Sequence, residues 1–378
     1  MNKQEILGIF QDALKKPLSA HLEQWISEGG KAVGHYCTLI PDEIFTAAGM
    51  APYRIRGGGS EATDVADVYL SSHLCTFARH TANLALEGQF DFLSGIVGAN
   101  GCDQARRAYD VWKNKTKVPF RMIISVPRRP DENSIGWYKE ELQSLIAALE
   151  MHFSIKIAVE DLRKAVQLHN AIRRNLAALN GLRKAANPPI AGAEAVAVAI
   201  AAQVMPPESY NKLLEELLNA LRDSQGMNKY RVRLIVSGGE MDEPEFVKAI
   251  EDQGGLVVYE DTCFGGRYYE ELVSEDGDPL TRIAERYFYR MPCARTDDSF
   301  PRRYENLKKQ MKEFGAKGIV VQRINHCILN AGHSFLFSQK AKEDGTPILI
   351  IDREYLAHGY GQVKTRVQAF IESIESRS

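Results

Sequence analysis

The stretch KAVGHYCTLIPDEIFTAAGMAPYRIRG, residues 31–57, changes from a strand-like pattern to a helix-like pattern and back again. Residues 31–40 are predicted to form a short buried strand. Residues 41–49 begin with a proline followed by acidic residues, which is typical of the first turn of a helix. Residues 51–57 are strand-like once more. This order of strand, helix and strand predicts an α/β fold with a parallel sheet.

The same alternation recurs on both sides of a helical middle region. Before that region, strands are predicted at residues 90–100 and 120–127, with helices at residues 71–88 and 102–115. After it, strands are predicted at residues 231–239, 255–262, 318–324 and 347–354, with helices between them. The middle region has the apolar spacing of helices. We therefore predict a first α/β domain with an N-terminal helix at residues 1–132, a helical bridge at residues 133–226, and a second α/β domain at residues 227–378.

Composition narrows the class of protein. The chain has 378 residues, of which 44% are hydrophobic and 25% are charged, as in an ordinary globular protein of two domains. Apolar runs are too short to span a membrane, and the N-terminal segment MNKQEILGIFQDALKK lacks the apolar core of a signal peptide. We therefore expect a cytoplasmic protein. A net charge of -2 provides no general attraction for nucleic acid, so nucleic-acid binding is not expected.

The positions of the cysteines carry more information than their number. The six are Cys37, Cys75, Cys102, Cys263, Cys293 and Cys327. None forms a CxxC pair, and a reducing cytoplasm argues against disulfides. Within each half, neighbouring cysteines are 27 to 38 residues apart, about the length of one βα unit. Because the carboxyl ends of parallel strands meet at one edge of a sheet, three thiols from each half are predicted to converge on a shared cleft.

Two interpretations of these thiols remain open on the sequence pattern. Free cysteines often behave as small buried hydrophobes. Against that, turn residues accompany several of the thiols, in GANGC at residues 98–102, TCFGG at residues 262–266 and MPC at residues 291–293, and their amides can hydrogen-bond to cluster sulfur. Thiolates suit iron-sulfur clusters or zinc, and position alone does not separate these two metal sites.

Several segments carry a resemblance to a known superfamily. They are residues 34–79, 95–112, 259–272, 287–295, 318–327 and 361–372, which include YEDTCFGGRYYEEL, YFYRMPCAR and GIVVQRINHC. On these segments the chain resembles the 2-hydroxyacyl-CoA dehydratase and benzoyl-CoA reductase superfamily over nearly its whole length. It is most similar to the smaller cluster-bearing subunit of ATP-dependent benzoyl-CoA reductase.

The resemblance implies two flavodoxin-like domains and an oxygen-sensitive iron-sulfur cofactor. Positions matching Cys75, Cys102 and Cys327 would hold one four-iron cluster. Cys37, Cys263 and Cys293 bring the number of thiolates to six, which is the number that the double-cubane branch of the family uses to hold two bridged cubanes. We therefore favour a double-cubane 8Fe-9S cluster. A single 4Fe-4S cluster with an open or non-cysteine site is the alternative.

The resemblance also implies partners and a reaction. The expected partners are a sister subunit of the same fold, an ATP-hydrolysing iron-sulfur activator, ferredoxin as the electron source, and an aromatic acyl-CoA substrate, which the sister subunit would bind in the main. The chain has no GxxxxGK[ST] motif, in keeping with ATP hydrolysis on another protein. The alternatives are a 2-hydroxyacyl-CoA dehydratase subunit, a double-cubane reductase of small substrates, and a zinc-stabilised scaffold without activity.

Three further groups of residues are candidates with two interpretations each. Gly57 to Ser60, preceded by Arg54 and Arg56, could cradle a phosphate of coenzyme A or contact a partner, or could be a mobile surface turn. His35, His73, His326 and His333 lie near cysteines in the sequence, and could relay protons or be structural. Arg267 and Arg295 could offset the charge of a thiolate-bound cluster, or could form ordinary ion pairs.

Overall fold

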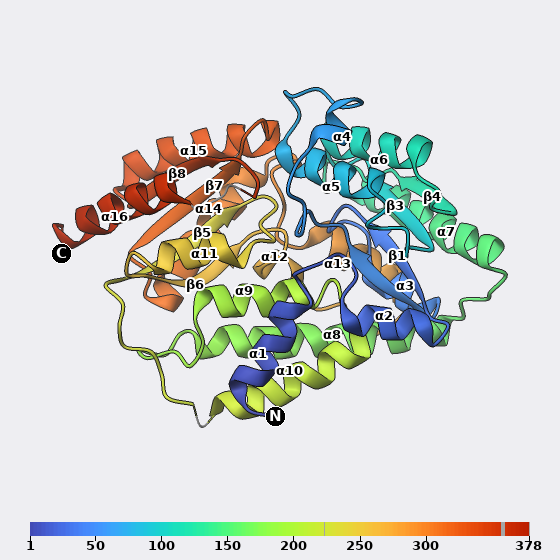
Figure 1. Ribbon diagram of the computed structural model, residues 1–378, viewed down its shortest axis with the longest axis horizontal. Coiled ribbons are helices and arrows are strands. Elements are labelled where there is room, and N and C mark those ends of the chain that lie inside the picture. The colour runs from blue at the N-terminus through green and yellow to red at the C-terminus, as the bar shows by residue number, and fades with distance from the viewer. Residues whose placement is uncertain (223, 357–359, 378) are drawn as a thin grey trace.

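The structure is a computed structural model that describes residues 1–222, 224–356 and 360–377. Figure 1 shows two α/β lobes side by side, with α1, α8, α9 and α10 packed along one side of both. Each lobe contains a four-stranded sheet, with the strand orders β2-β1-β3-β4 and β6-β5-β7-β8. All neighbouring strands are parallel. The predicted α/β class with two parallel-sheet domains is confirmed, and the two sheets share one strand order.

The first sheet and its helices follow the predicted alternation closely. The elements are α1 (Lys3–Asp12), α2 (Ala20–Ser27), β1 (Lys31–His35), α3 (Asp42–Ala47), β2 (Met50–Arg54), α4 (Asp64–Asp67), α5 (Thr76–Leu86), β3 (Gly95–Ala99), α6 (Asp103–Lys115) and β4 (Phe120–Ile124). Strands β2 and β3 are buried along their whole length, as expected of parallel strands covered on both faces.

Four helices connect the two sheets. They are α7 (Glu132–Phe153), α8 (Val159–Leu182), α9 (Gly192–Ala201) and α10 (Pro207–Arg222). In α10 the buried side chains include Tyr210, Leu213, Leu214 and Leu217, the spacing of one helix face. Tyr210 packs on Phe10 of α1 with ring centroids 5.4 Å apart, so the N-terminal helix is held against this helical layer.

The second sheet repeats the arrangement of the first. Its elements are β5 (Val232–Gly238), α11 (Pro244–Glu251), β6 (Gly255–Asp261), α12 (Gly266–Tyr269), α13 (Pro279–Tyr289), α14 (Ser299–Phe314), β7 (Gly318–Ile324), α15 (Ile328–Asp344), β8 (Ile348–Arg353) and α16 (Gly361–Glu375). Helix α13 leaves this lobe and packs on α7 and α8, and its Ile283 joins Val33 and Leu142 in one hydrophobic cluster. The two halves therefore share part of their core.

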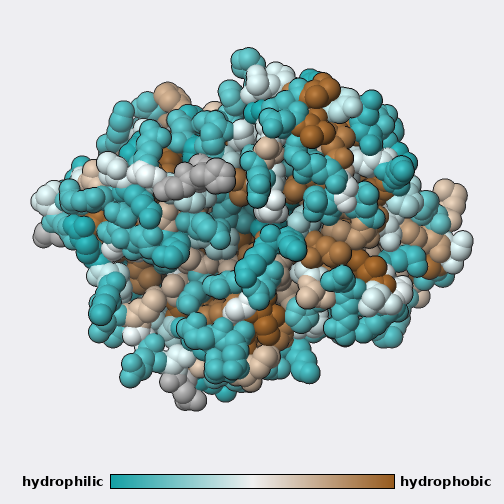
Figure 2. Space-filling view, in the orientation of Figure 1, coloured by the Kyte–Doolittle hydropathy of each residue, from teal (hydrophilic) through white to brown (hydrophobic). Residues whose placement is uncertain are grey.

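An apolar area of the surface is formed by α4 and the residues that follow it. Figure 2 shows hydrophobic side chains gathered on the surface over α4. The large apolar residues exposed in this segment are Val65, Val68 and Tyr69, and Val68 is 75% exposed. Apolar surface of this kind often marks a contact with another protein. Among the described residues, no helix is both long enough and apolar enough to span a lipid bilayer.

Candidate metal centre

All six cysteines line one cavity. Its volume is about 110 Å³, and the cysteines share its lining with Tyr36, Glu240, Arg267, Arg295 and Asn330 among others. Cys37, Cys102, Cys263 and Cys327 each follow the end of a strand, namely β1, β3, β6 and β7. The carboxyl edges of the two sheets therefore face each other across this cavity. Three thiols from the first lobe and three from the second line it together.

Three of the thiols sit at the beginnings of helices. Cys75, Cys102 and Cys327 are the N-cap residues of α5, α6 and α15. The N-terminus of a helix carries partial positive charge and free amides, so it favours a negatively charged group. Cys102 Sγ accepts a hydrogen bond from the backbone N–H of Ala105 at 3.3 Å, and Cys327 Sγ accepts one from Asn330 Nδ2 at 3.2 Å.

The other three thiols lie in loops that line the same cavity. Cys37 follows β1, Cys263 follows β6, and Cys293 follows α13. The backbone N–H of Arg295 donates to Cys293 Sγ at 3.4 Å. A β-carbon on Gly101 would lie 3.4 Å from Cys37 Sγ, so Cys37 lies beside the segment that carries Cys102. The two sets of thiols thus adjoin within one cavity.

Burial disfavours the thiolate form, which a nucleophilic cysteine needs. It is the largest cause of a raised pKa at four of the cysteines: Cys37, Cys75, Cys102 and Cys263. The pKa of Cys102 rises to about 12. Catalytic thiols instead have lowered pKa values. Without a metal these thiols are protonated at neutral pH, so binding a metal here would release protons.

Buried cations surround the cavity and are only partly balanced by acids. Arg267 Nε lies 3.3 Å from Asp261, and Arg54 Nη2 donates to Glu240 at 2.8 Å. Arg295 is 4% exposed, and its side chain donates only to the carbonyls of Gly101, Val126 and Pro127. Among the described residues, no carboxylate lies within ion-pair distance of Arg295. A buried cation without a counter-charge is costly, and an anionic group in the cavity would offset it.

The residues present therefore fit a thiolate-bound iron-sulfur cluster. In the part of the chain that the structure describes, no three His, Cys, Asp or Glu side chains are close enough together to hold one metal ion. The thiols are spread around the cavity, whereas a structural zinc site needs four ligands converging on one ion. A cluster binds its thiolates through different iron atoms, so it suits such a spread better.

Glu240 is a cavity residue that the sequence analysis missed. It is the only carboxylate among the described residues lining the cavity, and its Oε2 is buried without a hydrogen-bond partner. Its position could have identified it from the sequence, because Glu240 follows β5 at the same sheet edge as Cys263 and Cys327. Asn330 was also missed, although it lies one helical turn after Cys327.

The interpretation of residues 57–60 as a phosphate cradle is wrong. Arg54 is fully buried against Glu240, and Arg56 lies 3.4 Å from Asp242 and is buried. The backbone N–H of Gly57 donates to the Tyr355 hydroxyl at 2.9 Å. The alternative of a surface turn is also inaccurate, because only Gly59 of these four residues is exposed. The segment is an internal turn that packs the two lobes together.

None of the four candidate histidines lines the cavity. His35 is buried, with Nε2 3.0 Å from Asp42 Oδ1. His73 and His326 are exposed and make a ring contact with centroids 5.9 Å apart. His333 Nδ1 lies 2.8 Å from Arg303 Nη1, which donates to it. The structural interpretation therefore accounts for His35 and His333.

We expect His333 to make the fold less stable in acid. Burial and then Arg303 lower the pKa of His333 to about 4, whereas a histidine in the unfolded chain has a pKa of about 6.5. Between these values the unfolded chain binds more protons, so the free energy of unfolding falls as pH falls from about 6.5 to about 4. Denaturant unfolding at several pH values should show a shallower dependence for His333→Gln. The exposed His152 provides the control, because His152→Gln should keep the wild-type slope. Equal slopes in all three proteins would contradict the expectation.

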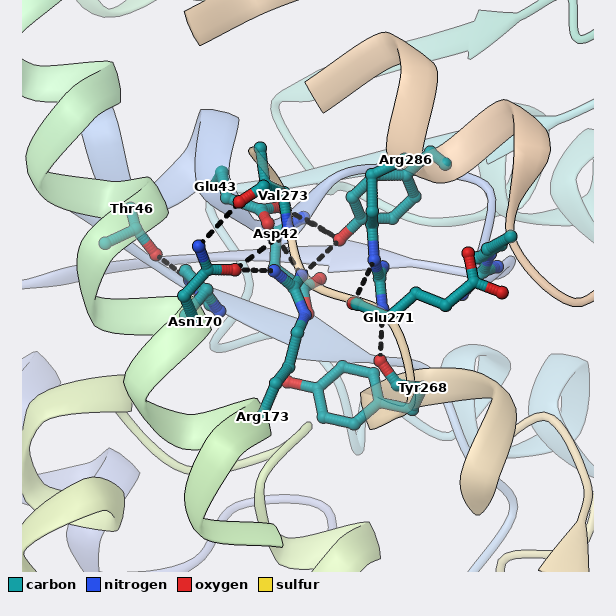
Figure 3. Close-up of polar contacts among 12 residues, drawn as sticks. Asp42, Glu43, Thr46, Asn170, Arg173, Tyr268, Glu271, Val273 and Arg286 are labelled. Atoms are coloured by element: carbon teal, nitrogen blue, oxygen red, sulfur yellow. Dashed lines mark hydrogen bonds and ion pairs between the residues drawn. The ribbon is translucent and has the colours of Figure 1, made fainter. Parts of the chain in front are cut away.

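A buried polar network anchors the segments next to Cys37 and Cys293. Figure 3 shows Glu43 of α3 meeting Arg173 of α8, with 2.6 Å between Oε1 and Nη2. The Tyr287 hydroxyl of α13 donates to Glu43 Oε2 at 2.9 Å. Asn170 of α8 donates to the carbonyl of Val273 at 2.8 Å and accepts from its N–H at 2.9 Å. The network therefore fixes α3, α8 and α13 relative to one another.

Comparison with known proteins identifies the family. Residues 37–374 match the family described as 2-hydroxyglutaryl-CoA dehydratase, D-component. The chain belongs to this family. The match extends over most of the chain and includes all six cysteines, so the predicted superfamily resemblance is confirmed.

Individual relatives are similar to the chain at low identity. A benzoyl-CoA reductase subunit of Thauera aromatica is 26% identical over 303 residues, which are 79% of this chain and 78% of that protein. The (R)-phenyllactyl-CoA dehydratase beta subunit of Clostridium sporogenes is 25% identical over 99% of this chain and all of that protein. The beta subunit of (R)-2-hydroxyglutaryl-CoA dehydratase from Acidaminococcus fermentans is 25% identical over 93% of this chain and 95% of that protein. Relatives of both reaction types are thus similarly distant.

Proposed function

We propose that the chain is the iron-sulfur subunit of an ATP-dependent benzoyl-CoA reductase-type enzyme. The observation that carries the proposal is the single cavity lined by six cysteines and flanked by buried arginines. A cluster bound there supplies low-potential one-electron chemistry, which the reduction of an aromatic acyl-CoA requires. The family membership supports an enzyme subunit.

A double cubane is the cluster that we propose. Cys75, Cys102 and Cys327 would hold one half, and Cys37, Cys263 and Cys293 would hold the other. The presence of both sets in one cavity supports this assignment over a single 4Fe-4S cluster, which would need only the first set.

The chain's own residues prepare the cavity for negative charge. Helix N-termini at Cys75, Cys102 and Cys327 point partial positive charge toward the site. Amide donors from Ala105, Asn330 and Arg295 reach sulfur atoms and favour the thiolate form. Hydrogen bonds to sulfur and limited exposure to solvent both tune the reduction potential of a thiolate-bound cluster.

The same cavity bears on where the substrate binds. All six cysteines line it, so a cluster held by them would itself take up this space. This supports substrate binding mainly on a sister subunit of the same fold. Relatives are named as subunits, including two different subunits of benzoyl-CoA reductase, and the exposed Val65 and Val68 are available for contact with a second chain. An ATP-hydrolysing iron-sulfur activator, supplied with electrons by ferredoxin, completes the proposed system in the cytoplasm.

A second candidate function rests on the same observation. This candidate is a double-cubane reductase of small substrates. It is supported because both sets of thiols belong to this one chain, and such an enzyme needs no acyl-CoA pocket.

A 2-hydroxyacyl-CoA dehydratase subunit is a further alternative, supported by relatives named as dehydratase subunits, which match up to 99% of the chain. In a dehydratase the electron is recycled, whereas in a reductase it is consumed.

Product analysis tests the proposed function. The complex isolated anaerobically through a tag on this chain, supplied with activator, reductant and ATP, should convert benzoyl-CoA to a cyclic dienoyl-CoA and consume reductant with each turnover. Dehydration of a 2-hydroxyacyl-CoA without net use of reductant would contradict the proposal and favour the dehydratase. The chain without activator should not hydrolyse ATP, and turnover by the pure chain would contradict the proposed division of labour.

A further inference from the structure

Two buried side chains each join the three segments that carry one set of cysteines. One is Gln104, in the first turn of α6, and the other is Arg290, which caps the end of α13. They are 7% and 6% exposed. Neither follows from the local sequence pattern, because each contacts backbone that is distant along the chain.

Gln104 connects Cys75, Cys102 and Cys327. It lies two residues after Cys102. Its Oε1 accepts a hydrogen bond from the backbone N–H of Cys75, and its Nε2 donates to the carbonyl of His326, the residue before Cys327, at 2.7 Å. One side-chain amide thus fixes the beginnings of α5, α6 and α15 relative to one another.

Arg290 makes the equivalent connection for Cys37, Cys263 and Cys293. It lies three residues before Cys293. Its Nη2 donates to the carbonyl of Thr38, the residue after Cys37, and its Nη1 donates at 2.8 Å to the carbonyl of Arg267, in α12 directly beyond the Cys263 loop. The guanidinium therefore joins one loop of the first lobe to two segments of the second.

The setting of Arg290 favours positioning over charge pairing. No carboxylate among the described residues lies within ion-pair distance of it, and its hydrogen-bond partners are carbonyls. The guanidinium lies 5.3 Å from the centroid of the Tyr287 ring. Tyr287 accepts a hydrogen bond from Arg173, and Arg286 donates to the carbonyl of Tyr268. This network, part of which Figure 3 shows, holds the end of α13 that carries Arg290 in place.

We propose that Gln104 and Arg290 are positioning residues, Gln104 for the Cys75, Cys102 and Cys327 set and Arg290 for the Cys37, Cys263 and Cys293 set. This inference rests on the proposed iron-sulfur function and adds to it that the two halves of the site are held independently. Ligands that come from distant segments keep their geometry only if those segments are fixed to one another. Loss of such outer partners typically weakens metal binding roughly 10- to 100-fold.

The test compares iron release from variants that lack the hydrogen bonds of Gln104 or Arg290. Gln104→Met keeps the length of the side chain and removes its hydrogen bonds, and Arg290→Met keeps an unbranched apolar stem and removes the guanidinium. Gln310→Met is the control, because Gln310 is also buried but lies in α14 and bonds only to Asn306 in the same helix. Each protein is purified anaerobically and treated with an iron chelator, and the remaining cluster is followed by electron paramagnetic resonance. The apo form of each variant is also unfolded to compare stability.

The expected result is selective loss. Gln104→Met and Arg290→Met should each release about half of the iron at least roughly 10-fold faster than wild type, and the surviving spectra of the two variants should differ. Gln310→Met should release iron like wild type. Arg290→Lys keeps the charge without the planar fork of donors, so it should remain defective if positioning is the role.

Three outcomes would overturn the inference. Iron release at the wild-type rate in either variant removes the role of that residue. Uniform loss of all the iron, with a loss of apo stability to match, indicates a general structural role. Full recovery by Arg290→Lys indicates that charge alone matters. Absence of iron and sulfide from the wild-type protein is a different result, because it refutes the proposed function itself.

Discussion

Replacing Cys263 with alanine is expected to remove about half of the iron from the anaerobic protein. The remaining iron would be held by Cys75, Cys102 and Cys327, and low-potential electron transfer would be lost. The reason is that Cys263 lines the cavity together with Cys37 and Cys293, and six thiolates are needed to hold both halves of a double cubane. If Cys263 were only a packed hydrophobe, its loss would cost about 1 kcal/mol of stability and the iron would stay.

Iron analysis and electron paramagnetic resonance on single variants measure this effect. Cys37→Ala and Cys293→Ala should behave like Cys263→Ala, whereas Cys75→Ala should damage the other half. Thr262→Val is a matched control, because Thr262 is buried directly before Cys263 and is not among the residues lining the cavity. It should keep its iron. Unchanged iron and spectra in all three alanine variants of the second set would reject the double cubane.

Replacing Arg173 with methionine is expected to lower the free energy of unfolding by about 3–5 kcal/mol. Arg173 and Glu43 are both essentially fully buried, and the substitution leaves the Glu43 carboxylate without its counter-charge. Burial alone would raise the pKa of Glu43, but Arg173, His169 and Arg286 together outweigh it and the pKa is lowered. The ionised carboxylate therefore depends on Arg173, and without it the chain must either bury the charge unpaired or protonate Glu43, and both cost stability.

Denaturant unfolding of the metal-free chain gives the comparison. The double variant Arg173→Met with Glu43→Gln should recover part of the loss, because the charge of Glu43 is removed together with that of Arg173. Lys248→Ala breaks the exposed ion pair with Asp252 and should change the free energy of unfolding by about 0.5 kcal/mol or less. An Arg173→Met protein as stable as the Lys248→Ala control would show that the network of Figure 3 does not hold α3 against α8.

The local features of the fold could be predicted from sequence for a physical reason. Strand-like runs and helix signals are set by neighbouring residues, so β1 and α3 were predicted close to their observed positions. The convergence of the cysteines followed as well, because the topology of a parallel sheet brings the ends of its strands to one edge.

The features that failed depend on contacts across the fold. Arg54 and Arg56 resembled phosphate ligands, but their partners Glu240 and Asp242 are each 186 residues away in sequence. Gln104 gave no local sign of its role for the same reason, since its amide reaches the carbonyl of His326. Sequence pattern indicates which edge a residue occupies, but not which distant carbonyl or carboxylate its side chain meets.

Iron and acid-labile sulfide per chain, measured on protein purified without oxygen, test the central claim most directly. The proposed double cubane predicts about eight irons, with sulfide in similar amount and no zinc, because six thiolates line the one cavity. About four irons would instead leave the single-cluster alternative. Stoichiometric zinc without sulfide, or six thiols free of metal in protein kept anaerobic throughout, would contradict the account.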